Sequence, residues 1–133
     1  MRVVARRRSG YAHDVDIEGG DHRLLVDEPT VAGGGDTGPA PTRLVAAGLA
    51  SCVAITMEMY AERKGWDLGD VEVTVDVEYE RYTPRSFSTA IHLPAELSDE
   101  QREKLLKVAG KCPVHRVLAH ETDVDISYRV EEG

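Results

Sequence analysis

The fold is decided by the stretch PTRLVAAGLASCVAITMEMYAERK, residues 41–64. Proline is tolerated in the first turn of a helix and glycine commonly follows the last, so this spacing predicts one helix from about Pro41 to Lys64, stopped by Gly65. Its front half has no polar face, and amphipathic character returns only near Glu58. A helix that is apolar all round must be covered all round. We therefore expect it to be the centre of the core, covered in part by a second subunit.

Alternating apolar and polar residues predict strands on both sides of this helix. Residues 11–17 and 22–26 alternate around a glycine turn, and residues 71–80, VEVTVDVEYE, alternate without a miss. Residues 86–93 are predicted as the next strand, with residues 82–85 as its connection, and residues 123–130 as the last. This order predicts an α+β fold with mainly antiparallel sheet, in a single domain over residues 1–133.

Two shorter helices are expected in the second half of the chain. Ser98 and Gln101 match a capping box, which opens an amphipathic helix. Cys112 and Pro113 begin another, through about Ala119, because proline is favoured at the first helical position. The residues expected to face inward from the first of these helices are Leu105, Leu106, Val108 and Ala109.

Composition excludes several classes of protein. The 133 residues carry a net charge of −8, which argues against a nucleic-acid partner. No apolar run approaches the about 20 residues of a membrane span, so no membrane partner is expected. The two cysteines are too few for a secreted disulfide scaffold. We expect a soluble cytoplasmic protein.

Each cysteine leaves two interpretations open. Cys112 is expected at a helix N-cap, where the helix dipole and free N–H groups favour a thiolate, or where a small residue simply packs under a turn. Cys52 lies inside the apolar helix, where a buried cysteine is usually inert. The small residues around Cys52 nevertheless leave room for a molecule to approach the sulfur. The residues that share its face by helical spacing are Leu49, Ile55, Thr56 and Met59.

A zinc site is a further alternative. Cys112, His115 and His120 have C-x2-H-x4-H spacing, and Cys52 could supply a fourth ligand. The pattern lacks the two paired knuckles of typical structural sites, and His120 falls at a predicted helix end.

Three motifs resemble a known family. GGGDTGPAPTRLVAAGLASC, MYAERKGW and LSDEQREKLLKVAGKCPVHRVL are similar to segments of the OsmC/Ohr superfamily, the osmotically inducible protein C and organic hydroperoxide resistance proteins. The likeness runs from about Asp27 to Val130. It implies an intertwined homodimer in which antiparallel sheets from both chains wrap two long central helices, in agreement with the apolar helix above.

The resemblance also implies a function. Cys52 would be the peroxidatic residue that attacks a hydroperoxide and becomes a sulfenic acid, and Cys112 would resolve it to a disulfide. A dithiol reductant, in this family often lipoyl-linked, would restore both thiols without metal or organic cofactor. The residues expected to line the substrate pocket are Leu49, Thr56, Met59, Pro113 and His115.

The sequence departs from the family at one point. Relatives orient the peroxide with an N-terminal arginine, held by a glutamate in the loop before the cysteine helix. Thr42 and Arg43 stand where that glutamate is expected, and Arg43 could supply charge itself. The missing glutamate keeps open a non-enzymatic module that holds a small apolar ligand at the dimer groove. The best match to the arginine is Arg8, and the other candidates are Arg6, Arg7 and Arg23.

Overall fold

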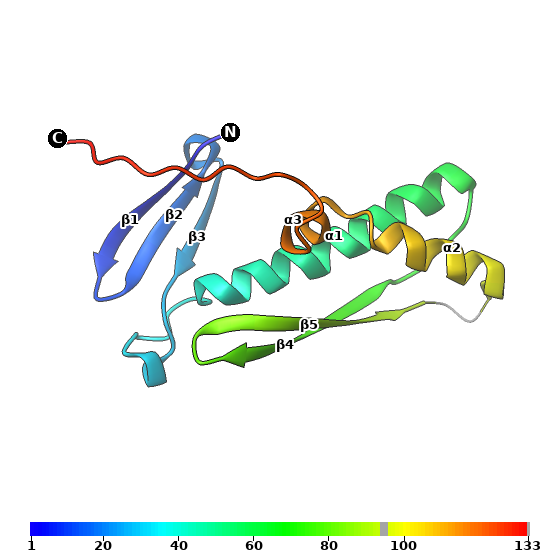
Figure 1. Ribbon diagram of the computed structural model, residues 1–133, viewed down its shortest axis with the longest axis horizontal. Coiled ribbons are helices and arrows are strands. Elements are labelled where there is room, and N and C mark those ends of the chain that lie inside the picture. Colours follow the sequence, from blue (N-terminus) through cyan, green and yellow to red (C-terminus); the bar gives the residue numbers. More distant parts are fainter. Residues whose placement is uncertain (94–95, 133) are drawn as a thin grey trace. The chain divides into compact units, whose positions relative to one another are not determined.

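The computed structural model describes residues 1–93 and 96–132 (Figure 1). Its helices and strands form two compact units, residues 1–47 with 77–87 and residues 48–76 with 88–133. The single domain over residues 1–133 stays a prediction. The α+β class is confirmed. The elements are β1 (Val3–Ser9), β2 (Ala12–Ile17), η1 (Glu18–Gly20), β3 (His22–Val26), η2 (Thr30–Ala32), α1 (Pro41–Lys64), β4 (Glu72–Glu80), β5 (Thr83–His92), α2 (Asp99–Ala109) and α3 (Pro113–Leu118).

The first unit contains an antiparallel sheet of three strands, in the order β1-β2-β3. Only β2 and β3 were predicted from the sequence, and β1 was missed because its run of arginines hides the alternation. The register places Arg6 opposite Asp14 and Asp16 opposite Arg23. Opposite charges on facing strands stabilise such pairs, so cross-strand charge pairing supports a strand that has few apolar residues.

The strands β4 and β5 form a second sheet. Their connection is only Arg81 and Tyr82, because β5 begins at Thr83 rather than near residue 86 as expected. A connection of two residues fits only antiparallel strands. The backbone of Arg81 is left-handed, with φ of 59°, as tight hairpin turns require.

The predicted central helix is confirmed as α1, and Gly65 follows it with φ of 73°. Its buried residues recur every four positions and are Leu49, Val53, Met57 and Ala61. Its other faces are apolar but uncovered in the single chain, since Ile55 is 51% and Met59 59% exposed. One chain therefore does not cover this helix all round.

The length and composition of α1 also suffice for a membrane span, with a mean hydropathy of 1.6 over its most apolar window. The expectation that no segment would qualify was wrong, because small and apolar residues are continuous through the front of the helix. The core helix of a soluble protein passes the same test, so this property is weak evidence of a membrane location.

The capping box of α2 is confirmed. The Ser98 hydroxyl accepts the backbone N–H of Gln101 at 3.1 Å, and the Gln101 side chain accepts the backbone N–H of Ser98 at 2.8 Å. Leu105 and Ala109 are buried as expected. The prediction for Leu106 was wrong: this side chain is 66% exposed, because consecutive helical residues lie about 100° apart around the axis.

The predicted last strand is not formed in the single chain, where residues 123–130 have no regular structure. A strand needs a neighbour to satisfy its N–H and C=O groups, and no described strand pairs with this segment. Its apolar residues are all exposed, namely Val124, Ile126, Tyr128 and Val130.

Candidate active site

Cys112 is the N-cap residue of α3, as the sequence predicted. Pro113 occupies the first turn, and the Cys112 sulfur accepts the backbone N–H of His115 at 3.4 Å. The residue is completely buried, with an exposed fraction of 0%. Its thiol therefore lies in a water-poor environment but keeps a polar partner at the start of the helix.

The side chain of Cys52 lies close enough to that of Cys112 to raise the pKa of the Cys112 thiol. Cys52 lies in the middle of α1 and is half-buried, and both cysteines are free thiols. Two residues far apart in the sequence thus meet within the second unit of the chain. Cys52 is the more exposed of the two residues.

Burial is the main cause that raises the pKa of Cys112 above its ordinary value. The hydrogen bond with Cys52 and the charge on Cys52 also raise this pKa, while the backbone N–H groups of His115 and Val114 lower it. The N-cap position alone would favour a thiolate, but burial and the second thiol outweigh it here. At neutral pH Cys112 therefore keeps its proton and can donate it.

The five expected pocket residues differ in exposure. Leu49 is buried, and Thr56 and His115 are half-buried. Met59 and Pro113 are exposed, and Met59 borders a cleft with Glu62 and Arg63. The His115 ring is engaged, since its Nε2 lies 3.1 Å from a carboxylate oxygen of Glu121. The assignment of these five residues to a substrate pocket stays a prediction.

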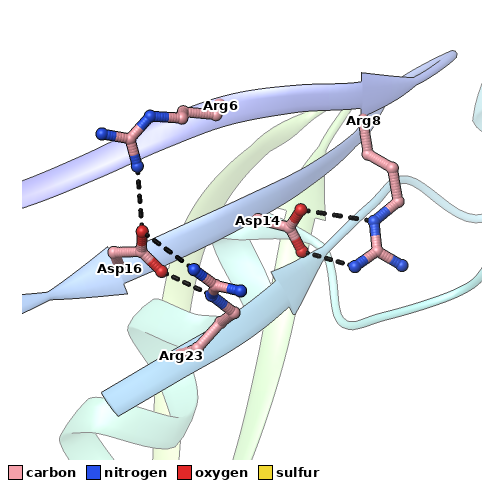
Figure 2. A network of polar contacts seen from close by, with 5 residues as sticks. All are labelled: Arg6, Arg8, Asp14, Asp16 and Arg23. Carbon is pink, nitrogen blue, oxygen red and sulfur yellow. Dashed lines mark hydrogen bonds and ion pairs between the residues drawn. The ribbon is translucent and has the colours of Figure 1, made fainter. Parts of the chain in front are cut away.

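Three of the four N-terminal arginine candidates are ion-paired with aspartates on the first sheet (Figure 2). Arg8 Nη2 lies 2.8 Å from Asp14 Oδ1. Arg6 Nη1 and Arg23 Nε contact the two oxygens of Asp16 at 2.9 and 2.6 Å. The hydrogen bond from Arg23 is the main cause that lowers the pKa of Asp16. These guanidinium groups are thus already paired within their own sheet.

The remaining arginine candidates differ from one another. Arg7 donates from Nε to the carbonyl oxygen of Gly10 at 2.9 Å. Arg43 is exposed in the first turn of α1, and within residues 1–93 and 96–132 its guanidinium has neither a hydrogen-bond partner nor an ion-pair partner. A catalytic role for Arg8 or Arg43 stays a prediction.

Asp27 is a positioning residue that sequence reasoning missed. Its buried carboxylate accepts the backbone N–H groups of Glu28, Gly35 and Thr37, and the Thr37 hydroxyl at 2.7 Å. The Thr37 hydroxyl is the largest cause that lowers the pKa of Asp27. These bonds hold the glycine-rich loop that leads into α1. No local motif marks such a residue, because its partners lie up to ten positions away.

Two glycines let this loop lie against the chain that precedes it. A Cβ at Gly34 would overlap the carbonyl oxygen of Glu28, and one at Gly38 would overlap that of Leu25. Backbone blocks both positions, so no side-chain movement could make room. The glycine-rich composition of the loop is therefore a packing requirement.

The zinc alternative gains no support from the geometry. Within the part of the chain that the structure describes, no group of three or more histidine, cysteine, aspartate or glutamate side chains is arranged to hold a metal ion. The proposed ligands have other partners: Cys112 contacts Cys52, and the His115 ring contacts Glu121.

Comparisons with known proteins agree with this architecture. An uncharacterized protein of Haloferax volcanii is 26% identical over 111 residues, which is 81% of this chain and 80% of the relative. An OsmC-like protein of Mycoplasma pneumoniae matches with a TM-score of 0.76 and 16% identity, over 89% of this chain and 86% of the other.

Two further structures carry names related to peroxide resistance. The Legionella pneumophila organic hydroperoxide resistance protein OsmC matches with a TM-score of 0.65 and 24% identity, over 89% of each chain. A Vibrio cholerae protein designated a putative organic hydroperoxide resistance protein, with captopril bound in one of its active sites, matches with a TM-score of 0.63 and 26% identity. The match covers 89% of this chain and 84% of the Vibrio cholerae chain. The family model described as OsmC-like protein matches residues 33–127. The chain therefore belongs to the OsmC-like protein family, within the OsmC/Ohr superfamily.

Proposed function

We propose that this protein is a thiol-dependent peroxidase that reduces organic hydroperoxides or hydrogen peroxide. Membership of the OsmC-like family, and the likeness to the Vibrio cholerae protein, support a role in redox stress. The observation that carries the finer proposal is that the thiols of Cys52 and Cys112, 60 positions apart in the sequence, lie close enough to interact.

The proposed cycle uses both sulfurs. The Cys52 thiolate attacks the terminal oxygen of the hydroperoxide, the O–O bond breaks, and the departing alkoxide takes a proton to leave as alcohol, or as water from hydrogen peroxide. Cys52 is thereby oxidised by two electrons to a sulfenic acid. The Cys112 thiol then displaces water and forms the disulfide, and an external dithiol exchanges with it to regenerate both thiols.

The unequal environments of the two thiols support this division of roles. Cys112 is fully buried and its pKa is raised, so it suits a resolving thiol that waits with its proton. Cys52 is half-buried and thus the more exposed of the two residues, which suits the thiol that meets the substrate. The difference in burial therefore supports Cys52 as the thiol that attacks the peroxide and Cys112 as the thiol that resolves the sulfenic acid.

Thiol acidity alone would not make an efficient enzyme. Lowering a thiol pKa by about two units gains only about three-fold in reactivity at neutral pH, because nucleophilicity falls with pKa. Enzymes commonly reach about 10⁶-fold or more. The site must therefore also orient the peroxide and stabilise the departing oxyanion, and Arg43 and Arg8 are the residues we propose for that task.

The partners are part of the proposal. A second copy of the chain would cover the exposed apolar residues of α1, such as Ile55 and Met59, and would offer a sheet edge to residues 123–130. The proposed reductant is a dithiol of the lipoyl-linked kind that the family resemblance implies. Since disulfide cycling of this kind needs a reducing compartment, we propose a cytoplasmic location.

The deciding experiment counts thiols. Reduced protein is treated with one equivalent of cumene hydroperoxide or hydrogen peroxide, and free thiols and intact mass are measured. The proposal expects the loss of both thiols, a mass decrease that corresponds to one disulfide, and full recovery with dihydrolipoamide. Survival of both thiols in excess peroxide would overturn the enzyme proposal.

A second candidate function is supported by a cleft in the first unit. It has a volume of about 570 Å³ and an apolar wall that includes Ala5, Val15, Val26 and Leu44. Such a cleft could hold a small apolar ligand without catalysis. Native mass spectrometry of the purified protein tests this alternative, and the absence of any retained or added apolar ligand would count against it.

A further inference from the structure

A second cleft in the first unit has a different chemical character. It has a volume of about 570 Å³ and lies between the η2 segment, the start of α1 and the β4–β5 turn. Its polar and aromatic lining residues are Tyr11, Glu28, Thr42, Arg43, Tyr79, Arg81 and Tyr82. Neither cysteine is among its lining residues, whereas Arg43, which is proposed above to orient the peroxide, is one of them.

Two arginines line this cleft without a counter-charge of their own. Among the residues described, neither Arg43 nor Arg81 has a hydrogen-bond or ion-pair partner, whereas Arg6, Arg8 and Arg23 are all paired with aspartates. The chain carries a net charge of −8, so carboxylates that could pair with an arginine outnumber the basic residues. Two unpaired guanidinium groups in one cleft are attracted to an anion, and guanidinium matches the planar shape of a carboxylate.

The remaining lining residues limit the size and charge of that anion. Glu28 contributes one negative charge, so the lining carries two positive charges and one negative charge, which favours a ligand with a single charge. Three tyrosines offer flat apolar faces. The Tyr79 hydroxyl lies 3.1 Å from the Thr42 hydroxyl, which fixes one of these rings against the first turn of α1.

We infer that this cleft binds an organic monocarboxylate with a flat apolar body, held by Arg43 and Arg81 and stacked on the tyrosines. The cleft volume falls within the usual range for small-molecule sites, about 300–1,000 Å³. The inference goes beyond the proposed peroxidase, because it concerns binding and requires no reaction at sulfur.

The test uses the full chain in its reduced form and isothermal titration calorimetry. The probe is 2-naphthoate, and its neutral isostere 2-naphthylmethanol serves as the comparison. The expected result is one saturable carboxylate site per chain, with the alcohol at least about ten-fold weaker because it lacks the charge-assisted hydrogen bonds. Absence of saturable binding, or equal binding of both probes, would overturn the inference.

Variants locate the site. Arg81→Asn removes the charge while asparagine tolerates the left-handed backbone at this position, and about ten-fold weaker naphthoate binding is expected. Arg43→Gln should weaken binding similarly. Arg85→Gln is the matched control, because Arg85 lies on β5 outside the lining and contacts Glu80 at 3.5 Å, and it should bind like the wild type.

A second copy of the chain is the competing occupant of the cleft. If Arg81→Asn changes the oligomeric mass in light scattering and leaves naphthoate binding unchanged, the cleft is a subunit contact and the inference fails. Tyr82→Ala gives an independent readout, since this exposed ring should contribute to binding of both probes. Peroxide consumption is measured separately, so failure of the binding inference is distinguishable from failure of the peroxidase proposal.

Discussion

The thiol of Cys112, fully buried at the start of α3, lies close enough to the thiol of Cys52 in the middle of α1 to interact with it. Burial contributes most to the raised pKa of Cys112, and the hydrogen bond and charge of Cys52 add to it. Cys52 therefore influences the ionisation of Cys112, and this influence can be measured without any peroxide.

Replacing Cys52 by alanine should lower the pKa of Cys112. Two causes that raise it disappear with the Cys52 thiol, while burial keeps the pKa above the ordinary value. The rate of alkylation of Cys112 by iodoacetamide, followed against pH by peptide mapping, reports this pKa in both proteins. An unchanged or higher pKa in Cys52→Ala would contradict the coupling.

The two serine variants should fail at different steps. Cys112→Ser keeps the attacking sulfur, so one equivalent of peroxide should leave a sulfenic acid on Cys52 that dimedone traps. Cys52→Ser keeps only the buried, protonated thiol, and its oxidation should be at least about ten-fold slower than that of the wild type. Dimedone trapping on Cys112 in the Cys52→Ser variant, with none on Cys52 in the Cys112→Ser variant, would reverse the proposed roles.

Local signals predicted the helices because their determinants lie within a few residues. Proline at position 41 and Gly65 bounded α1, and Ser98 with Gln101 set the start of α2. The N-cap position of Cys112 followed from the proline after it. Such features depend on backbone groups that the same short segment must satisfy.

Features that depend on distant partners were harder to predict. The strand β1 is stabilised by Asp14 and Asp16 on its neighbour, which alternation within β1 itself cannot show. Helical spacing favoured an inert Cys52, and only the family resemblance suggested that it meets Cys112. The role of Asp27 depends on a loop that closes back on it, so no pattern marked it.

Asp27→Asn should destabilise the protein at neutral pH by several degrees in Tm. The hydrogen bonds that lower the pKa of Asp27 favour its charged form in the folded state. That stabilisation is present above the pKa of the unfolded state and is lost as pH falls through the lower folded pKa. The difference in Tm between wild type and variant should therefore shrink from about pH 7 to about pH 3.

Asp36→Asn is the matched control for that comparison. Asp36 lies in the same loop, is exposed, and has φ of 54°, a left-handed conformation that asparagine tolerates. The Tm of the Asp36→Asn variant should stay close to that of the wild type at every pH. An equal loss of Tm in both variants would mean that the hydrogen bonds accepted by the Asp27 carboxylate contribute no specific stabilisation.

Ser98→Ala should destabilise the protein by about 1 kcal/mol, the usual cost of losing an N-cap. The serine hydroxyl satisfies the Gln101 N–H at the start of α2, and alanine leaves that group to water. Ser98→Gly should cost only about a few tenths of a kcal/mol, since glycine suits the N-cap backbone. Chemical denaturation of the three proteins checks this order.

Ile55→Glu should dissociate the proposed homodimer. Ile55 is exposed on α1, in a part of the helix whose residues are mostly apolar, and a second copy of the chain would bury it. A carboxylate buried in such an interface without a partner is strongly unfavourable. Light scattering should give twice 14.6 kDa for the wild type and 14.6 kDa for the variant. Glu103→Lys, an exposed change on α2, should remain dimeric. A monomeric wild type at micromolar concentrations would overturn the dimer and leave α1 to be covered by another partner.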